Sequence, residues 1–209
     1  MADVTVNVLT PATEFGLMTL DELKTALGIA TSDPVTDAQW QWMIDVNSAT
    51  ISELCNRVFA KEEVEETWRE VQNGQRIYLT HYPVVAADIE SVTTGGIDRI
   101  AIDYELEELT GKLQIFTSFV EPVVVTYTGG FDLPDDAPLP LKQALTLLAA
   151  NWKAQLAMIQ VTGVRMIAHK EARVMFHTPA NVAPGAGGLH PGVPPAVDSI
   201  LLQYTRFWV

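Results

Sequence analysis

Apolar residues first recur at helical spacing in the segment MTLDELKTALG, residues 18–28. Thr19 and Glu22 have the spacing of a capping box, in which each residue satisfies a backbone N–H at the start of a helix. Gly28 is a natural helix end. The pattern therefore predicts a short helix whose buried face is formed by Leu20, Leu23 and Leu27.

The same signal returns in VTDAQW, residues 35–40, and predicts a second helix. Thr36 and Gln39 have capping-box spacing, and Val35 and Trp40 are placed to pack across that box. The helix is expected to run to about Val58. Its predicted apolar face consists of Trp40, Met43, Ile44, Ile51, Leu54, Cys55 and Val58, and Asn47 continues that stripe as a polar residue that faces either a partner helix or solvent.

From Glu62 the period changes to that of β-strands. Asn73-Gly74 predicts a hairpin turn, and Gly95-Gly96 and Thr110-Gly111 predict two further turns. The pattern indicates a β region of roughly five or six strands that extends to about Thr128.

Helical signals resume at Pro140, a residue type favoured in the first helical turn. Between residues 144 and 150 the only polar residue is Thr146. A helix that is apolar on almost every side is buried on more than one side. We therefore expect a second copy of the protein to cover part of this helix, with the predicted contact residues Leu141, Leu145, Leu148 and Trp152.

The C-terminal part is less regular. RVMF, residues 173–176, reads as a short strand, and residues 179–195 are rich in Pro, Gly and Ala, which predicts an arm or long loop. The segment around residues 197–204 is expected to be helical. An apolar, aromatic end is ordered when it docks on something, and the residues predicted to dock on a partner are Leu201, Leu202, Tyr204, Phe207 and Trp208.

Together these elements predict an α+β fold: a helical bundle of two N-terminal helices and a long third helix, with an inserted antiparallel β region and an extended C-terminal arm. The expected boundaries are 1–60 for the N-terminal helical part and 61–130 for the β-rich insertion. Residues 131–170 hold the long helix that completes the helical core, and residues 171–209 hold the strand, the arm and the docking segment.

Composition narrows the possible partners. The 209 residues carry a formal net charge of -13, and only 19% of them are charged, below the usual quarter or so. The acidic excess argues against a grip on nucleic acid, which needs clustered Lys and Arg, but it suits a wall past which DNA slides. A single cysteine excludes an intrachain disulfide, and we expect neither a signal peptide nor a membrane span.

Candidate chemistry is sparse. The histidines His81, His169, His177 and His190 form no metal-binding or catalytic motif, so they are expected to be solvent-facing or internally satisfied. Cys55 is expected to be a structural thiol. Two acidic clusters, one of Glu62, Glu63, Glu65 and Glu66 and one of Asp132, Asp135 and Asp136, could hold a cation but read better as solvated or helix-start charge. No cofactor or metal is predicted. Packing is expected for Trp40, Trp42, Trp68, Trp152 and Trp208.

The order of elements, with several local motifs, resembles the head–tail connector, or adaptor, family of tailed bacteriophages. The resemblance covers residues 18 to about 157. It rests on MTLDELKTALGI, TDAQWQWMIDVNSATISELCNRVF, EEVEETW, IYLTHYPVVAADIESVT and DYELEELTGKLQI. Its best match is VVVTYTGGFDLPDDAPLPLKQALTLLAANW, a strand followed by two glycines, an Asp/Pro corner and a long helix.

The resemblance implies a structural, non-enzymatic protein of the virion neck that is assembled in the host cytoplasm. It implies a homo-oligomeric ring, commonly of twelve copies, below the portal protein, with the C-terminal segment reaching the portal. Such a ring extends the DNA channel without sequence-specific binding and offers the next surface to the tail, a stopper or a tail-terminator protein. Two alternatives stay open: a monomeric ligand-binding module built on the β region, and a hydrolase that uses Cys55 or a histidine.

Overall fold

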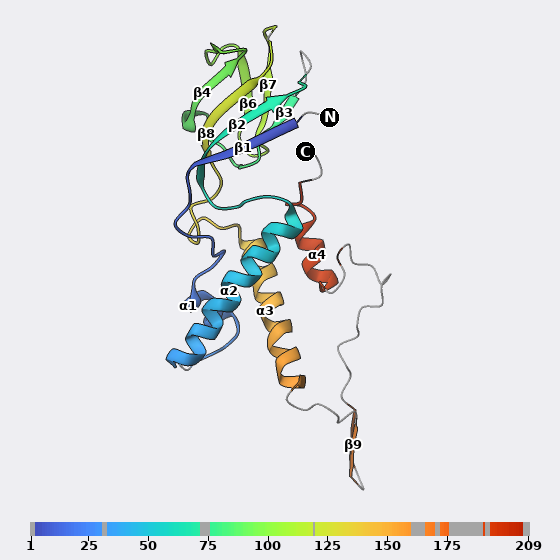
Figure 1. Cartoon of the computed structure of the whole chain (residues 1–209). Helices are drawn as coiled ribbons and strands as arrows, with labels where there is room; N and C mark the ends of the chain where they lie inside the picture. Colours follow the sequence, from blue (N-terminus) through green and yellow to red (C-terminus); the bar gives the residue numbers. More distant parts are fainter. Residues whose placement is uncertain are drawn as a thin grey trace. The chain divides into compact units, whose positions relative to one another are not determined.

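The computed structural model describes residues 3–30, 33–71, 76–118, 120–159, 166–169, 172–175, 190 and 193–206 (Figure 1). Helices and antiparallel strands are both present, so the predicted α+β class is confirmed. The chain divides into two units. The β-rich unit comprises Met1–Met18, Cys55–Ala137 and Thr205–Val209, and the helical unit comprises Thr19–Leu54 and Pro138–Tyr204.

The β-rich unit contains two antiparallel sheets. The larger sheet has the order β1-β2-β8-β4-β5, formed by Asp3–Thr10, Glu62–Arg69, Val123–Gly129, Ile89–Thr94 and Ile97–Asp98. The smaller sheet has the order β3-β7-β6, formed by Arg76–Tyr78, Lys112–Ile115 and Tyr104–Glu107. A single 3-10 turn, η1 (Ala86–Asp88), precedes β4.

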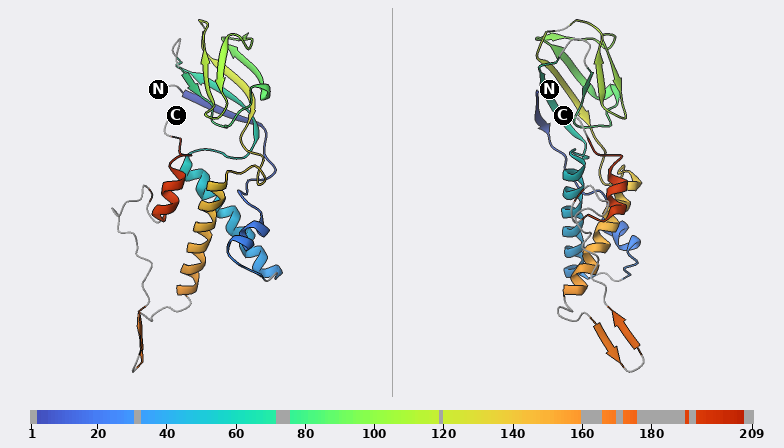
Figure 2. Two further views of the ribbon diagram at one scale, coloured as in Figure 1. Left: turned by 180° about the vertical axis from the view of Figure 1, so that it is seen from behind. Right: turned by 90° about the vertical axis from the view of Figure 1, so that its right-hand side faces the viewer.

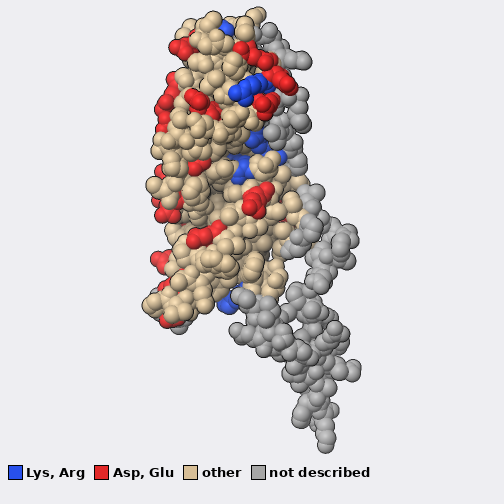
Figure 3. Space-filling model, viewed as in Figure 1, with Lys and Arg blue, Asp and Glu red and all other residues tan. Residues whose placement is uncertain are grey.

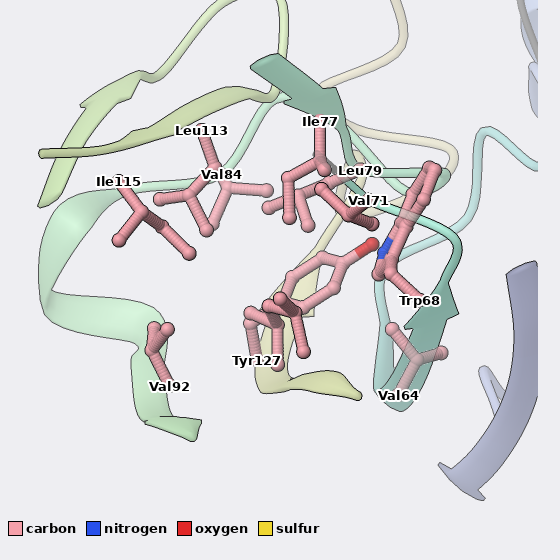
Figure 4. Packing of buried hydrophobic residues seen from close by; sticks show 12 residues of the cluster. Val64, Trp68, Val71, Ile77, Leu79, Val84, Val92, Leu113, Ile115 and Tyr127 are labelled. Carbon is pink, nitrogen blue, oxygen red and sulfur yellow. The ribbon is translucent and has the colours of Figure 1, made fainter. Parts of the chain in front are cut away.

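Alternation along β2 and β8 builds the core of this unit, because successive side chains of a strand point to opposite faces. Every second residue from Glu62 to Trp68, and from Val123 to Gly129, is buried. Figure 4 shows the ring of Tyr127 among aliphatic side chains, with its hydroxyl pointing toward the indole of Trp68. Both sheets contribute to this core, which consists of Val64, Trp68, Val71, Ile77, Leu79, Val84, Val92, Leu113, Ile115, Val123, Val125 and Tyr127.

The predicted turns have mixed outcomes. Gly95 and Gly96 join β4 to β5, and Gly111 lies between β6 and β7, so these two hairpins are confirmed. The hairpin predicted at Asn73-Gly74 is wrong, although the turn itself lies outside the described residues. Strand β2 pairs with β1 and β8, whereas β3 pairs with β7 in the other sheet.

The structure also places the start of the chain differently from the predicted boundaries. Residues 3–10 form β1, which pairs antiparallel with β2 from Asp3↔Arg69 to Thr10↔Glu63. The first residues thus belong with the β-rich unit rather than with the helices, because the open edge of β2 needs a hydrogen-bonding neighbour.

The helical unit contains α1 (Leu20–Ala26), α2 (Pro34–Cys55, whose last residue falls in the β-rich unit), α3 (Leu139–Ile159) and α4 (Pro195–Leu201). Side chains tie α1 to both long helices. The Lys24 ammonium lies 2.5 Å from Asp37 of α2, and the Lys142 ammonium of α3 lies 2.7 Å from Glu22. Helix α4 packs against α3. None of the described helices is long and apolar enough to cross a membrane.

The structure confirms the predicted start of the first helix but not that of the second. Thr19 caps α1, its hydroxyl accepting from the Glu22 N–H at 3.2 Å while the Glu22 carboxylate accepts from the Thr19 N–H at 2.8 Å. The second predicted box is wrong by one turn. Helix α2 begins at Pro34, and the Asp33 carboxylate accepts from the Thr36 N–H at 3.2 Å and from its hydroxyl at 2.8 Å.

The surroundings of several α2 residues can be compared with the prediction. Val35 is 68% exposed, so it does not pack across a box with the buried Trp40. Asn47 is 2% exposed and therefore lies in the core rather than facing solvent. The predicted apolar stripe is otherwise buried, except that Leu54 and Val58 are half-buried.

The helical unit also contains a small sheet, the third that the structure describes. Strands β9 (Met166–His169) and β10 (Ala172–Met175) pair antiparallel with each other and form a sheet of their own (Figure 2). The predicted strand in RVMF corresponds to β10, whereas β9 was not predicted.

Candidate functional site

Cys55, which is predicted to be a structural thiol and which only the hydrolase alternative uses as a nucleophile, has no reactive setting. Cys55 is buried, and burial raises the pKa of its thiol to about 11, although the Arg57 charge opposes that shift. The thiolate, which is the reactive form, is therefore scarce at neutral pH. The structure supports a packing role for this side chain.

The acidic run on β2 divides into two kinds of carboxylate. Glu63 and Glu65 are half-buried on the outer face of the sheet, whereas Glu62 and Glu66 are 6% and 0% exposed. The prediction of a uniformly solvated acidic face is wrong for the second pair. Their positions follow from the period of two, since Glu62 and Glu66 lie in register with the buried Val64 and Trp68.

Glu66 is the centre of a buried hydrogen-bond network. Its Oε1 accepts from the Tyr127 hydroxyl at 2.5 Å, from the Thr80 N–H at 2.7 Å and from the Thr80 hydroxyl. Its Oε2 accepts from the Trp68 indole N–H at 2.9 Å. Four donors therefore replace the water that burial removes from this carboxylate.

His81 extends the network toward Glu62. Its Nδ1 lies 2.8 Å from the Thr80 hydroxyl oxygen, and its Nε2 lies 3.1 Å from Glu62 Oε2. Its backbone N–H donates to the Tyr127 hydroxyl at 3.0 Å. Histidine 81 is thus internally satisfied, as the sequence predicts, and it links β2, β8 and the segment after β3.

The protonation states of this network follow from burial. Burial lowers the pKa of the His81 imidazole below its ordinary value, although Glu66 and Glu62 act in the opposite direction. Burial also raises the pKa of the Tyr127 phenol well above its ordinary value, and Glu66 adds to that shift. Both groups are neutral at pH 7. A neutral His81 has one ring N–H, so it donates either to Glu62 from Nε2 or to the Thr80 hydroxyl oxygen from Nδ1, but not to both.

The other histidine with a described side chain also has a partner. His190 Nδ1 lies 2.9 Å from Asp198 Oδ1, and its N–H donates to Oδ2 at 3.2 Å. The side chain of His169 and the whole of His177 lie outside the described residues. Among the residues that the structure describes, no group of three His, Cys, Asp or Glu side chains is placed to hold a metal ion.

Two motifs that are distant in sequence meet around Arg57. The guanidinium carbon lies 3.5 Å from the ring centroid of Tyr82 and 4.6 Å from that of Phe59, and an Nη donates to the Tyr82 carbonyl. The segment NRVF after α2 thereby holds the segment HYP after β3. Cation–π stacking of this kind is strongest where water is excluded, and Arg57 is 8% exposed.

The two glycines after β8 allow close backbone approach. A Cβ on Gly130, whose φ is +111°, would lie 2.3 Å from the Ala60 carbonyl oxygen. A Cβ on Gly129 would lie 2.4 Å from the His81 carbonyl oxygen. The two glycines thus let the end of β8 pack directly against the backbone of the Phe59–Lys61 segment and of His81.

The predicted contact residues on α3 separate into two groups. Leu141, Leu145 and Leu148 are 0%, 0% and 5% exposed in the single chain, so they belong to its core and are not available to a second copy. This part of the prediction is wrong, because residues of the same chain already bury these three leucines. Trp152 is 40% exposed and stays a predicted contact.

A different face of α3 remains uncovered, and it carries no charge. It includes the exposed Leu139, Gln143 and Ala154 and the half-buried Leu147 and Ala150. On α2, Trp42 is 57% exposed. Large side chains of this kind in contact with water are typical of surfaces that bind another protein. We call the α3 residues Leu139, Gln143, Leu147, Ala150 and Ala154 the uncharged face.

The tryptophans are distributed between core and surface. Trp40 and Trp68 are buried, and the two exposed ones, Trp42 and Trp152, lie on helices. Packing is therefore confirmed for Trp40 and Trp68. Among the described residues, the β-rich unit has no exposed tryptophan that could stack on a carbohydrate.

The C-terminal segment is held by its own chain as far as Arg206. Leu201 is 1% exposed, which contradicts its prediction as a docking residue, because α4 packs against α3. The Arg206 N–H donates to the Cys55 carbonyl at 2.9 Å, and its guanidinium donates to the Tyr78 carbonyl at 3.2 Å. Leu202 is 47% exposed and Tyr204 is half-buried. Phe207 and Trp208 lie outside the described residues.

The surface has few cations. On the face in Figure 3, Asp and Glu outnumber Lys and Arg, and most of the area carries neither. This agrees with the composition of 26 acidic and 13 basic residues. Such a surface repels nucleic-acid phosphates instead of binding them.

Comparisons with known proteins relate this architecture to viral particles. No curated protein matches the chain. Among solved structures, a chain titled as part of the virion of the native gene transfer agent (GTA) particle has a TM-score of 0.57 at 15% identity and covers 98% of this chain and 97% of that one. Chains from the neck of the empty GTA particle, computed with C6 symmetry, and from the neck of the native particle, computed with C12 symmetry, have TM-scores of 0.56 at the same identity and coverage. These structures share the fold.

The family assignment comes from the sequence itself. The family model described as head completion protein matches residues 16–162. The matched region contains both long helices and all strands from β2 to β8. The predicted relation to phage head–tail proteins is thus confirmed: the chain belongs to the head completion protein family.

Proposed function

We propose that the protein is a structural component of the neck of a tailed phage or phage-like particle. The observation that carries this proposal is the family match over residues 16–162. The fold shared with chains from GTA virion and neck structures supports it. In this role the protein performs no catalysis, which agrees with the inert setting of Cys55.

The proposed assembly is a homo-oligomeric ring, of twelve copies, that lies below the portal protein and extends the DNA channel. A ring needs head-to-tail contacts between two different surfaces of each copy. The uncharged face of α3, together with Trp152, provides one surface, and the exposed Trp42 on α2 provides an apolar surface for the other. The acidic excess suits a channel that DNA crosses without being bound.

The two open ends of such a ring bind different neighbours. One end binds the portal protein, to which the exposed Leu202, with Tyr204, Phe207 and Trp208, contributes. The other end binds the tail, a stopper or a tail-terminator protein. The assembled protein resides in the virion neck and is assembled in the host cytoplasm.

A mass measurement tests this function. Native mass spectrometry and negative-stain microscopy of the purified protein, alone and mixed with the portal protein encoded by the same genome, should detect a ring of about twelve copies. A protein that remains monomeric at high concentration and does not bind the portal contradicts the proposal. A monomer that binds a sugar or peptide through the β-rich unit would favour the ligand-binding alternative.

A further inference from the structure

Strand β1 leaves one edge of the larger sheet open. It stands last in the strand order, and β2 is its only neighbour within the part of the chain that the structure describes. Seven of its eight residues are exposed, and the strand contains neither Lys nor Pro. In proteins that stay monomeric, charged residues, proline or a covering segment usually prevent an edge strand from pairing with another chain. Apart from Asp3 at its start and a shift in register after Val8, β1 has none of these.

Strands β9 and β10 have the complementary property. Among the described strands they pair only with each other, from Met166↔Met175 to Ala172↔His169, and form a two-stranded sheet. An isolated two-stranded hairpin is marginally stable in water, and it gains stability when a third strand joins it. Each copy therefore carries one open acceptor edge and one hairpin with free edges.

The two elements also match in chemistry. Strand β1 exposes Val6, Val8 and Leu9, and β9 and β10 contribute apolar residues such as Ile167 and Val174 in sequence. The solvent-facing positions of β1 and β2 carry the carboxylates of Asp3, Glu63 and Glu65 and one cation, Arg69. Residues 165–173 contain three cations and one anion in sequence. Opposite charges across such a contact favour the correct pairing.

We propose that the β9–β10 hairpin of one copy adds to the open edge of β1 in a second copy and extends the five-stranded sheet across the subunit boundary. Backbone hydrogen bonds between strands supply the affinity in this mode of recognition. The contact joins two different surfaces, so it continues from copy to copy as a ring requires, whereas β1 pairing with β1 would stop at a dimer. The inference rests on the proposed ring.

Cysteine cross-linking tests the pairing directly. The only native cysteine is buried, so it gives little background. One set of variants carries a cysteine on β1, at Asn7 or Val8, and the other carries it on the hairpin, at Ala168 or Val174. Rings assembled from a mixture of the two sets should form, on oxidation, covalent dimers that contain one copy of each kind.

Two results would overturn the pairing: rings in which no combination cross-links, and dimers formed by the β1 variants alone. A ring without the mixed cross-link contradicts only this pairing and leaves the proposed function intact. A native protein that never assembles, with or without portal, contradicts both.

A second variant tests the pairing without depending on its register, which decides whether two introduced cysteines are close enough to react. Val6→Lys with Val8→Lys places charge on exposed side chains of the edge, which blocks addition of a strand while the monomer keeps its fold. We expect assembly to weaken about tenfold or more. The matched control is Leu109→Lys, at a residue that is 81% exposed beside the β6–β7 turn. Assembly of the β1 variant at the native level, with the control also unchanged, would refute the proposal.

Discussion

Glu66 is a fully buried carboxylate in a protein with an acidic surface. Its burial is tolerated because four donors, from Trp68, Thr80 and Tyr127, surround its two oxygens. The same donors lie on β2, on β8 and after β3, so the carboxylate fixes these segments relative to one another. Such a network is stabilising only when it is complete, since a single lost partner leaves a buried polar group without water.

Tyr127→Phe tests the completeness of this network. The substitution keeps the ring but removes the hydroxyl that donates to Glu66 and accepts from the His81 N–H. We expect the free energy of unfolding of the β-rich unit to fall by about 1–3 kcal/mol, as measured by chemical denaturation. Tyr104→Phe is the control, because the Tyr104 hydroxyl makes no hydrogen bond within the described part of the chain. A Tyr127 variant as stable as this control would show that the network contributes little.

His81 predicts a pH dependence. Its folded pKa is lowered by burial, so the unfolded chain binds the proton more readily as the pH falls below the ordinary histidine pKa of about 6.5. The stability that depends on a neutral His81 is therefore present above this pH and is lost on acidification through the lowered folded pKa. Glu62, Glu66 and Arg206 are the charged groups that act on this imidazole.

Denaturation curves between about pH 7.5 and 5 measure this effect. His81→Gln should flatten the dependence, because glutamine keeps a hydrogen-bonding side chain but takes up no proton. An unchanged pH slope in this variant would mean that other groups control the acid sensitivity.

At the level of elements, substitutions at the start of α2 can show whether Asp33 or Thr36 caps this helix. If Asp33 caps the helix as the structure has it, Asp33→Ala should cost about 1 kcal/mol and Thr36→Ala clearly less. Asp33→Asn is the control, because asparagine caps almost as well as aspartate. Thermal unfolding of the three variants measures the difference. A larger loss for Thr36→Ala would restore the capping box that the sequence pattern predicts.

Local signals made much of the fold predictable. The capping box at Thr19, the helix start near Pro140 and the turns at Gly95-Gly96 and Gly111 each depend on residues close in sequence. The sequence pattern places the start of α2 too late, because Asp33 and Thr36 are both good capping residues. The choice between them depends on which residue leaves the extended conformation first, and the pattern alone does not decide this.

Contacts between distant segments were not predictable. The period of two in the EEVEETW run places Glu66 on the same face as Val64 and Trp68, but it does not reveal the distant donors that satisfy this carboxylate. Likewise, β2 and β3 are adjacent in sequence, yet they belong to different sheets. The sequence pattern predicts that the α3 leucines contact a partner, because it does not reveal that α4 packs against α3.

At the scale of the whole molecule, the uncharged face of α3 makes the proposed ring testable by one substitution. Ala150→Glu introduces a charge at a half-buried position of this face. The charge should prevent close contact with a neighbouring copy, because an unpaired carboxylate buried in an interface is costly. We expect the ring to dissociate into monomers in size-exclusion chromatography with light scattering, with little change in the unfolding temperature of the monomer.

Leu109→Glu is the matched control for this substitution. It adds the same charge at an exposed turn of the β-rich unit and should leave the ring intact. If the Ala150 variant assembles as the native protein does, the uncharged face is not a contact between copies.

The β-rich unit is assembled from three separate pieces of chain, the last of which contributes Arg206. During translation, β1 leaves the ribosome first, but its neighbour β2 follows only after both N-terminal helices. The carbonyls of Cys55 and Tyr78 receive their donors later still, when Arg206 has been added. A nascent chain that stops before Arg206 therefore lacks the donors for both carbonyls and cannot complete this unit.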